Sequence, residues 1–325
     1  MKTSSKEAFY DIERDGVTQG LLGTWLDCRQ KARLFLQGYS LKSTNMGLTF
    51  GTIVHACLDT VYSDIQAGKL RRVPSVDAVK AVVAKAETQW RKEHTTADPK
   101  ALEHLELALL LSEQVLPVYF EYWKRDLQEI KWTGLEQLFS IPYTLSDGRK
   151  TRLRGRRDGD FLANKALNLF ETKTKSFINE DDLVDRLPFD LQSNFYLHAL
   201  RKQKQQLPTG MLYNLIRRPQ LHQGKKESLP EFAKRCADDI RSRPDWYFTR
   251  LHLSISEREM DKFDGQLEDL LTDFYDWWQG ESGHYMNTNQ CETKYGRCDY
   301  LHMCAAKRMS YYYKRQVVFR ELEDY

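Results

Sequence analysis

The sequence lacks long apolar runs, and this absence bears first on membranes. The longest purely apolar stretch, residues 107–111, has five residues, whereas a membrane-spanning helix needs about 20. Residues 1–15 also lack the apolar core of a signal peptide. The two absences predict a cytoplasmic protein with no membrane partner.

Cysteine, glycine and proline are all sparse. Six cysteines in 325 residues are too few for a disulfide scaffold, and without an export signal they indicate reduced thiols or metal ligands. Glycine numbers 17 and proline 9, which excludes a linker-like or collagen-like chain. The glycine-rich motifs of dinucleotide-binding folds and of P-loops are absent from the sequence. A hydrophobic content of 41% is nevertheless enough for a sizeable core.

The chain has no large excess of positive or negative charge. The chain has 49 Lys and Arg against 46 Asp and Glu, a net charge of +3, so any nucleic-acid binding must come from local patches. The basic runs that suggest such patches are Arg152, Arg154, Arg156, Arg157; Arg201, Lys202, Lys204; Arg217, Arg218, Lys225 and Lys226. They predict a groove that follows phosphates; the alternative is an ordinary solvated face.

Helical and strand-like patterns divide the chain into a helical first part and a mixed second part. Helices are predicted over 48–67, 75–95 and 99–130, the last with a kink near Pro117. Strands are predicted over 135–144, 152–162, 167–173, 209–217 and 247–255, with helices over 188–203 and 256–279 and a polar loop over 219–232. This order predicts an α+β or mixed α/β fold.

Two acidic residues and a lysine form the most informative pattern. A two-residue turn at Asn164 and Lys165 would place Asp158 directly opposite Glu171, with their Cβ atoms about 5 Å apart. Two carboxylates this close repel unless a cation lies between them, and Mg²⁺ prefers such oxygen ligands. Lys173 shares the face of Glu171 and can orient a water or stabilise developing charge. The alternative is a solvated hairpin face of mixed charge.

The order of four motifs resembles a known nuclease family. The motifs are Gly155-Arg-Arg-Asp158, Glu171-Thr-Lys173, Gln192-Ser-Asn-Phe-Tyr196 and an upstream helical histidine, His55. In this order they resemble the PD-(D/E)XK nuclease superfamily in its RecB-like branch. That branch includes AddB-type recombination nucleases, CRISPR-adaptation nucleases and phage exonucleases.

This resemblance implies a fold, a domain organisation and residue roles. It implies one restriction-endonuclease-like domain over 1–325, with a helical region (1–130), a nuclease core (131–280) and a cysteine-rich C-terminal segment (281–325). It further implies that His55, Asp158 and Glu171 bind Mg²⁺ or Mn²⁺ and that Lys173 assists the attacking water. Gln192 and Tyr196 would line the DNA channel.

Helical spacing agrees with two of these assignments. Gly51 and His55 are four residues apart and therefore share one helix face, where glycine would let another segment approach closely. Gln192 and Tyr196 are spaced in the same way. The alternatives are a packed or solvated histidine and an ordinary helix with a half-buried tyrosine.

Four cysteines lie toward the two ends of the chain. Cys28 precedes the proposed core, and Cys291, Cys298 and Cys304 follow it, which resembles the arrangement in family members that hold a 4Fe-4S cluster through thiolates. The spacing between Cys291 and Cys298 is longer than usual there. A structural Zn²⁺ or free thiols are the alternatives, although the short knuckles typical of zinc sites are absent from the sequence.

These patterns together predict a metal-dependent DNA nuclease. The resemblance implies an exonuclease acting on single-stranded DNA or DNA ends in recombination, repair or phage replication, in a bacterial or phage-infected cell, alone or with a recombination or replication protein. The competing hypothesis is a catalytically silent DNA- or protein-binding module on the same fold. A third is a cysteine-metal protein with no DNA role.

Overall fold

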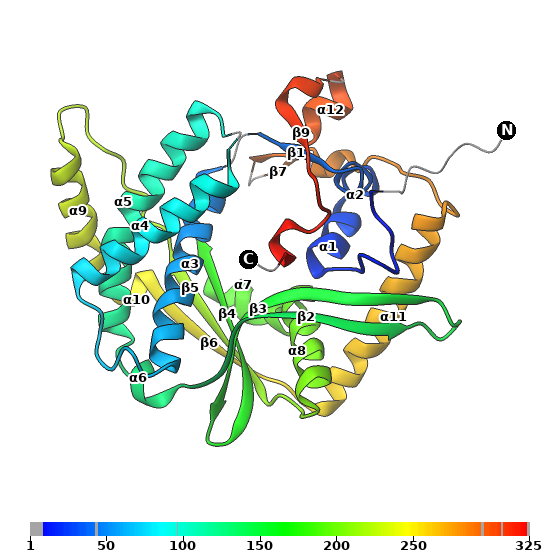
Figure 1. The fold of residues 1–325 in the computed structure, drawn as a ribbon, viewed down its shortest axis with the longest axis horizontal. Helices are drawn as coiled ribbons and strands as arrows, with labels where there is room; N and C mark the ends of the chain where they lie inside the picture. The colour runs from blue at the N-terminus through cyan, green and yellow to red at the C-terminus, as the bar shows by residue number, and fades with distance from the viewer. Residues whose placement is uncertain (1–8, 43–44, 96, 294–295, 307, 324–325) are drawn as a thin grey trace.

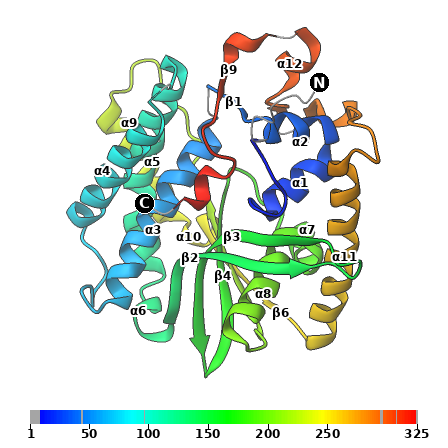
Figure 2. The same cartoon turned by 45° about the vertical axis from the view of Figure 1, so that its right-hand side comes forward.

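The computed structural model describes residues 9–42, 45–95, 97–293, 296–306 and 308–323. Residues 1–8, part of the segment inspected for a signal peptide, lie outside this set. A five-stranded sheet with the strand order β2-β3-β4-β5-β6 forms the centre, and helices cover both of its faces (Figures 1 and 2). The expected mixed α/β fold is confirmed. None of the described helices has the length and apolar character needed to span a membrane.

The sheet combines two long hairpin strands with a parallel pair. β2 (Lys131–Thr144), β3 (Lys150–Ala163) and β4 (Ala166–Lys175) are successive antiparallel neighbours. β4 then pairs in parallel with β5 (Gly210–Arg217), and β6 (Phe248–Ser254) closes the sheet antiparallel to β5. The parallel step requires a crossover connection, and the chain between β4 and β5 supplies one that contains a helix.

The predicted register of the β3–β4 hairpin is confirmed over its outer part. Pairing runs from Ala163↔Ala166 to Gly159↔Phe170, and the two turn residues, Asn164 and Lys165, have φ values of +49° and +69°, as a type I′ turn requires. The next pair would be Asp158 and Glu171, but the ladder stops before it.

One face of the sheet packs against the helices of the first part of the chain. These are α3 (Met46–Gln66), α4 (Val76–Glu93) and α5 (Pro99–Tyr122), joined by the short α6 (Asp126–Glu129) and by α9 (Leu229–Ser242) and α10 (Pro244–Tyr247). Most apolar side chains of α3 are buried in this core, including Ile53, Val54 and Cys57, whereas Leu48 in its first turn is 65% exposed. Each large apolar side chain buried there contributes about 1.5–3 kcal/mol, so the core fixes α3 against the sheet.

The opposite face packs against a second set of helices. These are α1 (Gln19–Asp27), α2 (Arg29–Leu36), α8 (Leu191–Lys204) and α11 (Glu257–Gln279). The two faces alternate along β5, where Met211 and Leu215 enter this core while Leu212 and Ile216 enter the other. This alternation explains why β5 is buried at every residue.

The C-terminal segment returns to the N-terminal helices. β1 (Tyr39–Leu41) pairs with β9 (Tyr312–Lys314), and between α11 and β9 the chain forms η2 (Thr288–Gln290), β7 (Glu292–Thr293), β8 (Gly296–Arg297), α12 (Leu301–Ala306) and η3 (Met309–Tyr311). The last turn, η4 (Arg320–Leu322), lies between α3 and α1 in both views (Figures 1 and 2).

Three expectations about helices need correction. The predicted helix 99–130 ends at Tyr122 and resumes as α6. Pro188 lies in η1 (Leu187–Phe189), after α7 (Glu180–Arg186), and α8 begins only at Leu191 because the Asp190 side chain caps its N-terminus. The predicted loop 219–232 ends earlier, since a capping box formed by Ser228 and Glu231 starts α9.

Candidate active site

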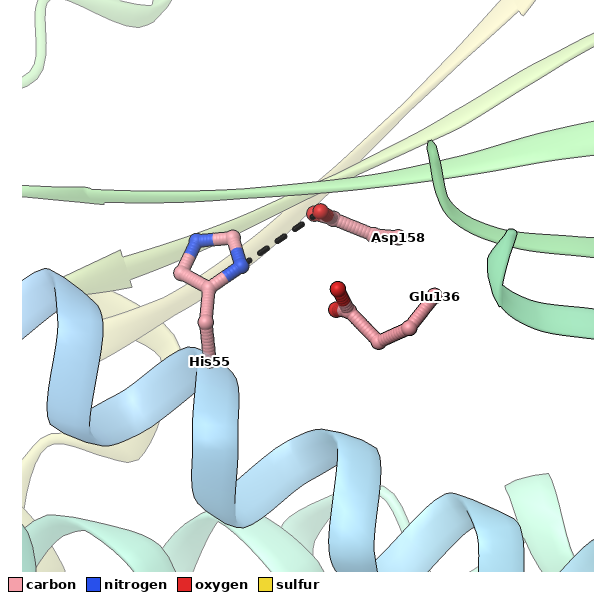
Figure 3. Close-up of side chains that lie close together, drawn as sticks. All are labelled: His55, Glu136 and Asp158. Carbon is pink, nitrogen blue, oxygen red and sulfur yellow. Dashed lines mark ion pairs between the residues drawn. The ribbon is translucent and has the colours of Figure 1, made fainter. Parts of the chain in front are cut away.

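Three side chains from three elements meet at the edge of the sheet. His55 comes from α3, Glu136 from β2 and Asp158 from β3, and one ligand atom from each lies within 4.8 Å of the others. The His55 Nδ1 atom is 3.4 Å from an oxygen of Asp158, and all three side chains point toward one another (Figure 3). Among the described residues this is the only group of three or more His, Cys, Asp or Glu side chains this close together.

Glu136 is the member of this group that the sequence analysis missed. It lies between the ladder pairs Leu135↔Gly159 and Gln137↔Arg157, across from Asp158 on the antiparallel strand. The Asp147-Gly148 pair is a typical hairpin signal, but a two-residue turn there would place Gln137 opposite Asp158. The observed loop is one residue longer, because the Leu145 N–H donates to the Arg149 carbonyl, and this register places Glu136 there. Glu136 has a φ of +45°, a conformation that is costly for a residue with a Cβ and that gathers at functional sites.

Glu171 and Lys173 lie beside this group on β4. The Lys173 Nζ atom donates to Glu171 Oε1 at 2.5 Å, and the Gln192 amide donates to the same oxygen at 2.9 Å. The other oxygen, Oε2, is buried and has no hydrogen-bond partner within the described part of the chain. An orphaned carboxylate oxygen costs free energy unless a further group meets it.

Asp158 is held by the backbone of β4. The Thr172 N–H donates to Asp158 Oδ2 at 2.7 Å, just where the ladder between β3 and β4 ends. The predicted pairing of Asp158 with Glu171 therefore takes a different form. The charge of Asp158 still acts on Glu171, but the Asp158 side chain contacts the main chain of β4.

Burial and mutual repulsion oppose the ionisation of two of the glutamates. Burial, followed by the charge of Asp158, raises the pKa of Glu171 to about 7 and that of Glu136 to about 8. Full ionisation of all three carboxyl groups is therefore unfavourable near neutral pH. A bound cation would reverse this penalty.

The pKa values of the other charged groups shift in the direction that favours their ionised forms. Burial opposes ionisation of Asp158, yet the charge of His55 and the Thr172 N–H hold its pKa below the usual range. Burial lowers the pKa of His55, but the charge of Asp158 and the hydrogen bond to it together outweigh burial and raise that pKa. The pKa of Lys173 is raised despite its burial, because Glu171 and Asp158 lie next to it, so Lys173 remains a cation at neutral pH.

Two glycines of the motifs allow close approaches around the site. A Cβ at Gly155 would lie 2.5 Å from the Phe139 ring and 3.2 Å from the Tyr196 ring. A Cβ at Gly51 would lie 2.9 Å from the Thr174 hydroxyl of β4, which confirms that glycine lets α3 come close to the strand that carries Glu171. Tyr196 itself is 7% exposed and packs edge-on against Phe139.

A wide groove of about 1770 Å³ opens onto the site. His55, Glu136, Asp158 and Lys173 all line it, with α3 and α4 contributing one wall and the segment after β4 another. The cationic side chains that line it are Lys85, Arg156, Lys173, Lys175, Arg186 and Arg218. The groove has room for a polymer strand to reach the acidic group.

Most of the basic residues expected to bind phosphate have structural roles instead. Arg157 is 1% exposed and donates to Gln203 and Asp160, and Arg201 pairs with Asp261. Lys204 pairs with Asp160 at 2.9 Å, so Asp160 belongs to a separate buried cluster rather than to the site. Of the predicted patches, Arg156 and Arg218 line the groove; Arg156 also pairs with Glu136 at 2.9 Å.

The four cysteines outside the core line one small cavity. Cys28, Cys291, Cys298 and Cys304 surround a space of about 20 Å³ between α1 and the C-terminal segment. The Asn287 N–H donates to the Cys28 sulfur. Across the described residues, no three of these sulfur atoms lie within 4.8 Å of one another, so the predicted metal centre is not confirmed. Cys57 and Cys236 are buried in the core, away from this cavity.

Comparison with known proteins assigns the family. The profile of the PD-(D/E)XK nuclease superfamily matches residues 19–305, so the chain belongs to this superfamily and its sheet is the restriction-endonuclease-like core. No curated protein matches the sequence.

Solved structures show only distant likeness. One, described as a "Putative exonuclease" from Eubacterium rectale, is 10% identical, with a TM-score of 0.49 over 98% of this chain and 97% of that chain. Another, SSO0001, is 11% identical, with a TM-score of 0.29 over 78% of this chain and 83% of that chain. The family assignment therefore rests on the sequence profile.

Nucleases of this superfamily use divalent metals, and the residues present fit one. Carboxylate and imidazole donors converge from three elements, a buried oxygen of Glu171 is without a partner in the described chain, and the clustered negative charge raises two pKa values. Each feature is what a hard divalent cation with oxygen ligands would relieve.

Proposed function

We propose that this protein is a metal-dependent deoxyribonuclease that hydrolyses phosphodiester bonds in the groove. The observation that carries this proposal is the convergence of His55, Glu136 and Asp158 within 4.8 Å, next to the Glu171–Lys173 pair. His55, Asp158 and Glu171 are the proposed Mg²⁺ or Mn²⁺ ligands, and Glu136 is a further candidate. A bound divalent ion supplies a Lewis acid and lowers the pKa of water.

Lys173 has the position and charge for a transition-state role. It is the cation nearest the buried Glu171 carboxylate, at 2.5 Å, and it lines the groove. A fixed ammonium there would orient the attacking water and stabilise the negative charge that develops on the phosphate.

Gln192 and Tyr196 are proposed to support the site from α8. The Gln192 amide holds Glu171 Oε1 at 2.9 Å, which leaves the other oxygen for the metal. Tyr196 packs behind Gly155 and so fixes β3 near Asp158. The family resemblance implies that both line the DNA channel, but neither is among the side chains that line the groove.

We further propose membership of the RecB-like branch and exonuclease activity. The C-terminal segment supports a requirement for a free DNA end, because it runs from α2 to α4 and reaches the groove. Phe319 packs against Phe35 on one side, Arg320 donates to the Glu93 carbonyl of α4 on the other, and Glu323 lines the groove. A strand would enter past this segment most easily by its end.

The four cysteines are proposed to hold a 4Fe-4S cluster. Their common cavity and the N–H donated to the Cys28 sulfur support thiolate ligation. The cluster would join α1 to the C-terminal segment. A structural zinc ion is the alternative.

The proposed setting is recombination, repair or phage replication in the cytoplasm of a bacterial or phage-infected cell, alone or with a recombination or replication protein. Cleavage of end-labelled linear and circular DNA with Mg²⁺ or Mn²⁺ tests the activity. We expect the protein to cleave linear DNA and to leave circular DNA intact. DNA binding without cleavage under either metal would instead identify a catalytically silent binding module.

A further inference from the structure

The most exposed apolar side chains of the described chain gather around one groove. Phe177 is 80% exposed, Phe189 77% and Leu48 65%, the three highest values among the large hydrophobic residues described. All three line the groove that contains Asp158 and Lys173. Neither phenylalanine belongs to the two large cores. Exposed apolar side chains that line one groove are typical of a binding surface.

Both rings are attached to elements that carry site residues. Phe177 lies four residues after Lys173, just beyond the end of β4, and so within ~13 Å of it along the chain. Phe189 ends η1 and is followed directly by Asp190, the cap of the helix that carries Gln192. A ligand in contact with these rings would also be within reach of the acidic group.

The charged side chains that line the groove favour a nucleic acid over an apolar ligand. Arg156, Arg186 and Arg218 line the same groove, and guanidinium groups and aromatic rings in one groove suit a chain of alternating phosphates and bases. Bases in a duplex already stack on both faces, whereas the faces of unpaired bases are open. Exposed aromatic rings therefore select single strands without selecting sequence.

We propose that Phe177 and Phe189 form a stacking platform that binds unpaired bases of a single strand and so sets the strand preference of the groove. This inference rests on the proposed nuclease function and names its substrate class as single-stranded DNA. The platform would hold the bases while the charged groups position a phosphate beside Asp158.

The test measures binding in the absence of cleavage. The full-length protein is titrated, with Ca²⁺ in place of Mg²⁺, into two fluorescent oligonucleotides of equal length and charge, one of thymidines and one of abasic sites. We expect the unaltered protein to bind the thymidine strand about 10-fold or more tightly than the abasic strand. We expect the double variant Phe177→Leu/Phe189→Leu to lose this preference and to keep its affinity for the abasic strand.

Matched variants separate stacking from apolar contact and from misfolding. Phe177→Tyr/Phe189→Tyr keeps the rings and should keep the preference for bases. Leu229→Ala removes an apolar side chain that is 58% exposed on α9, outside the groove, and should change neither affinity. Circular dichroism confirms that each variant is folded.

Two results would overturn the proposal. One is equal binding of thymidine and abasic strands by the unaltered protein; the other is a leucine variant that keeps the preference, as expected if the rings instead cover a protein partner. The outcome is independent of catalysis. Base-dependent binding without any cleavage would support the platform while contradicting the nuclease function.

Discussion

Glu136 lies across the β2–β3 ladder from Asp158 and reaches the same point in space from a left-handed backbone conformation, with φ at +45°. The conformation is unfavourable for glutamate by about 1–2 kcal/mol, and the carboxylate it presents is itself repelled by Asp158. The protein thus keeps a strained, charged residue where a relaxed one would be more stable. This arrangement is typical of a site retained for ligand binding.

Glu136 should contribute to metal binding. We expect Glu136→Gln to weaken Mn²⁺ binding about 10- to 100-fold, measured by calorimetry, while Glu121→Gln, an exposed glutamate paired with Lys124, leaves it unchanged. Glu136→Gly should weaken binding too, yet stabilise the metal-free protein by about 1 kcal/mol, because glycine adopts this φ without strain. Unchanged Mn²⁺ affinity in both variants would show that Glu136 does not bind the metal.

Asp158 and Glu171 should be required for cleavage but not for DNA binding. We expect Asp158→Asn and Glu171→Gln to lower the cleavage rate by at least about 100-fold, measured on end-labelled DNA. Affinity for DNA should stay the same or increase, because each change removes repulsion of phosphate. Near-normal cleavage by either variant would contradict the proposed ligand assignment.

Lys173 should act in the transition state. We expect Lys173→Ala to lower kcat strongly while KM and Mn²⁺ affinity change little, because its charge acts where negative charge develops. Lys173→Arg should restore part of the rate if charge alone matters. A variant whose KM rises while kcat is kept would identify Lys173 as a phosphate tether instead.

Metal binding should strengthen as pH rises from 6 to 8. The pKa values of Glu171 and Glu136, about 7 and about 8, lie above the usual value near 4.3. The metal must therefore displace protons at low pH, and Mn²⁺ affinity should rise by roughly tenfold per pH unit for each proton displaced. Calorimetry at pH 6, 7 and 8 measures this slope, and Glu136→Gln/Glu171→Gln should flatten it.

The same shifts predict the pH dependence of stability without metal. A folded-state pKa above the unfolded value means that these glutamates favour the fold fully below about pH 4.3 and lose that contribution as pH rises through 7 to 8. The unfolding temperature of metal-free protein should therefore fall over this range, and added Mn²⁺ should raise it most at pH 8. A metal-induced increase that is greatest at pH 6 would contradict the assignment.

The cysteine cavity should hold iron. Protein purified without oxygen should be brown, and single Ala variants of Cys28, Cys291, Cys298 or Cys304 should lose iron and unfold at lower temperature, because the ligands join the two ends of the chain. Cys236→Ala, which changes a buried cysteine on α9, should keep the iron. Colourless protein with one zinc ion per chain would show a tetrahedral zinc site in place of the cluster. Protein that is folded and active without iron or zinc would contradict any metal-binding role of the four cysteines.

The sequence alone determined the features that depend on local pattern. Apolar periodicity located α3 and the strands, and the turn at Asn164 and Lys165 determined the outer β3–β4 register, since strand pairing counts outward from a tight turn. The family motifs could be read because their spacing is fixed within single elements. Helix boundaries were less certain, because capping side chains such as Asp190 and Ser228 decide them.

Only the tertiary structure decided which distant residues meet. Glu136 meets His55 and Asp158 because α3 packs against the sheet. Several residues of the basic runs instead pair with other side chains of the fold, such as Lys204 with Asp160. Arg156 and Arg218 of these runs line the groove, together with the exposed Phe177 and Phe189, which no charge pattern indicates. Charge and apolarity are visible in a sequence; exposure and proximity depend on how separate elements pack, and no local pattern encodes that packing.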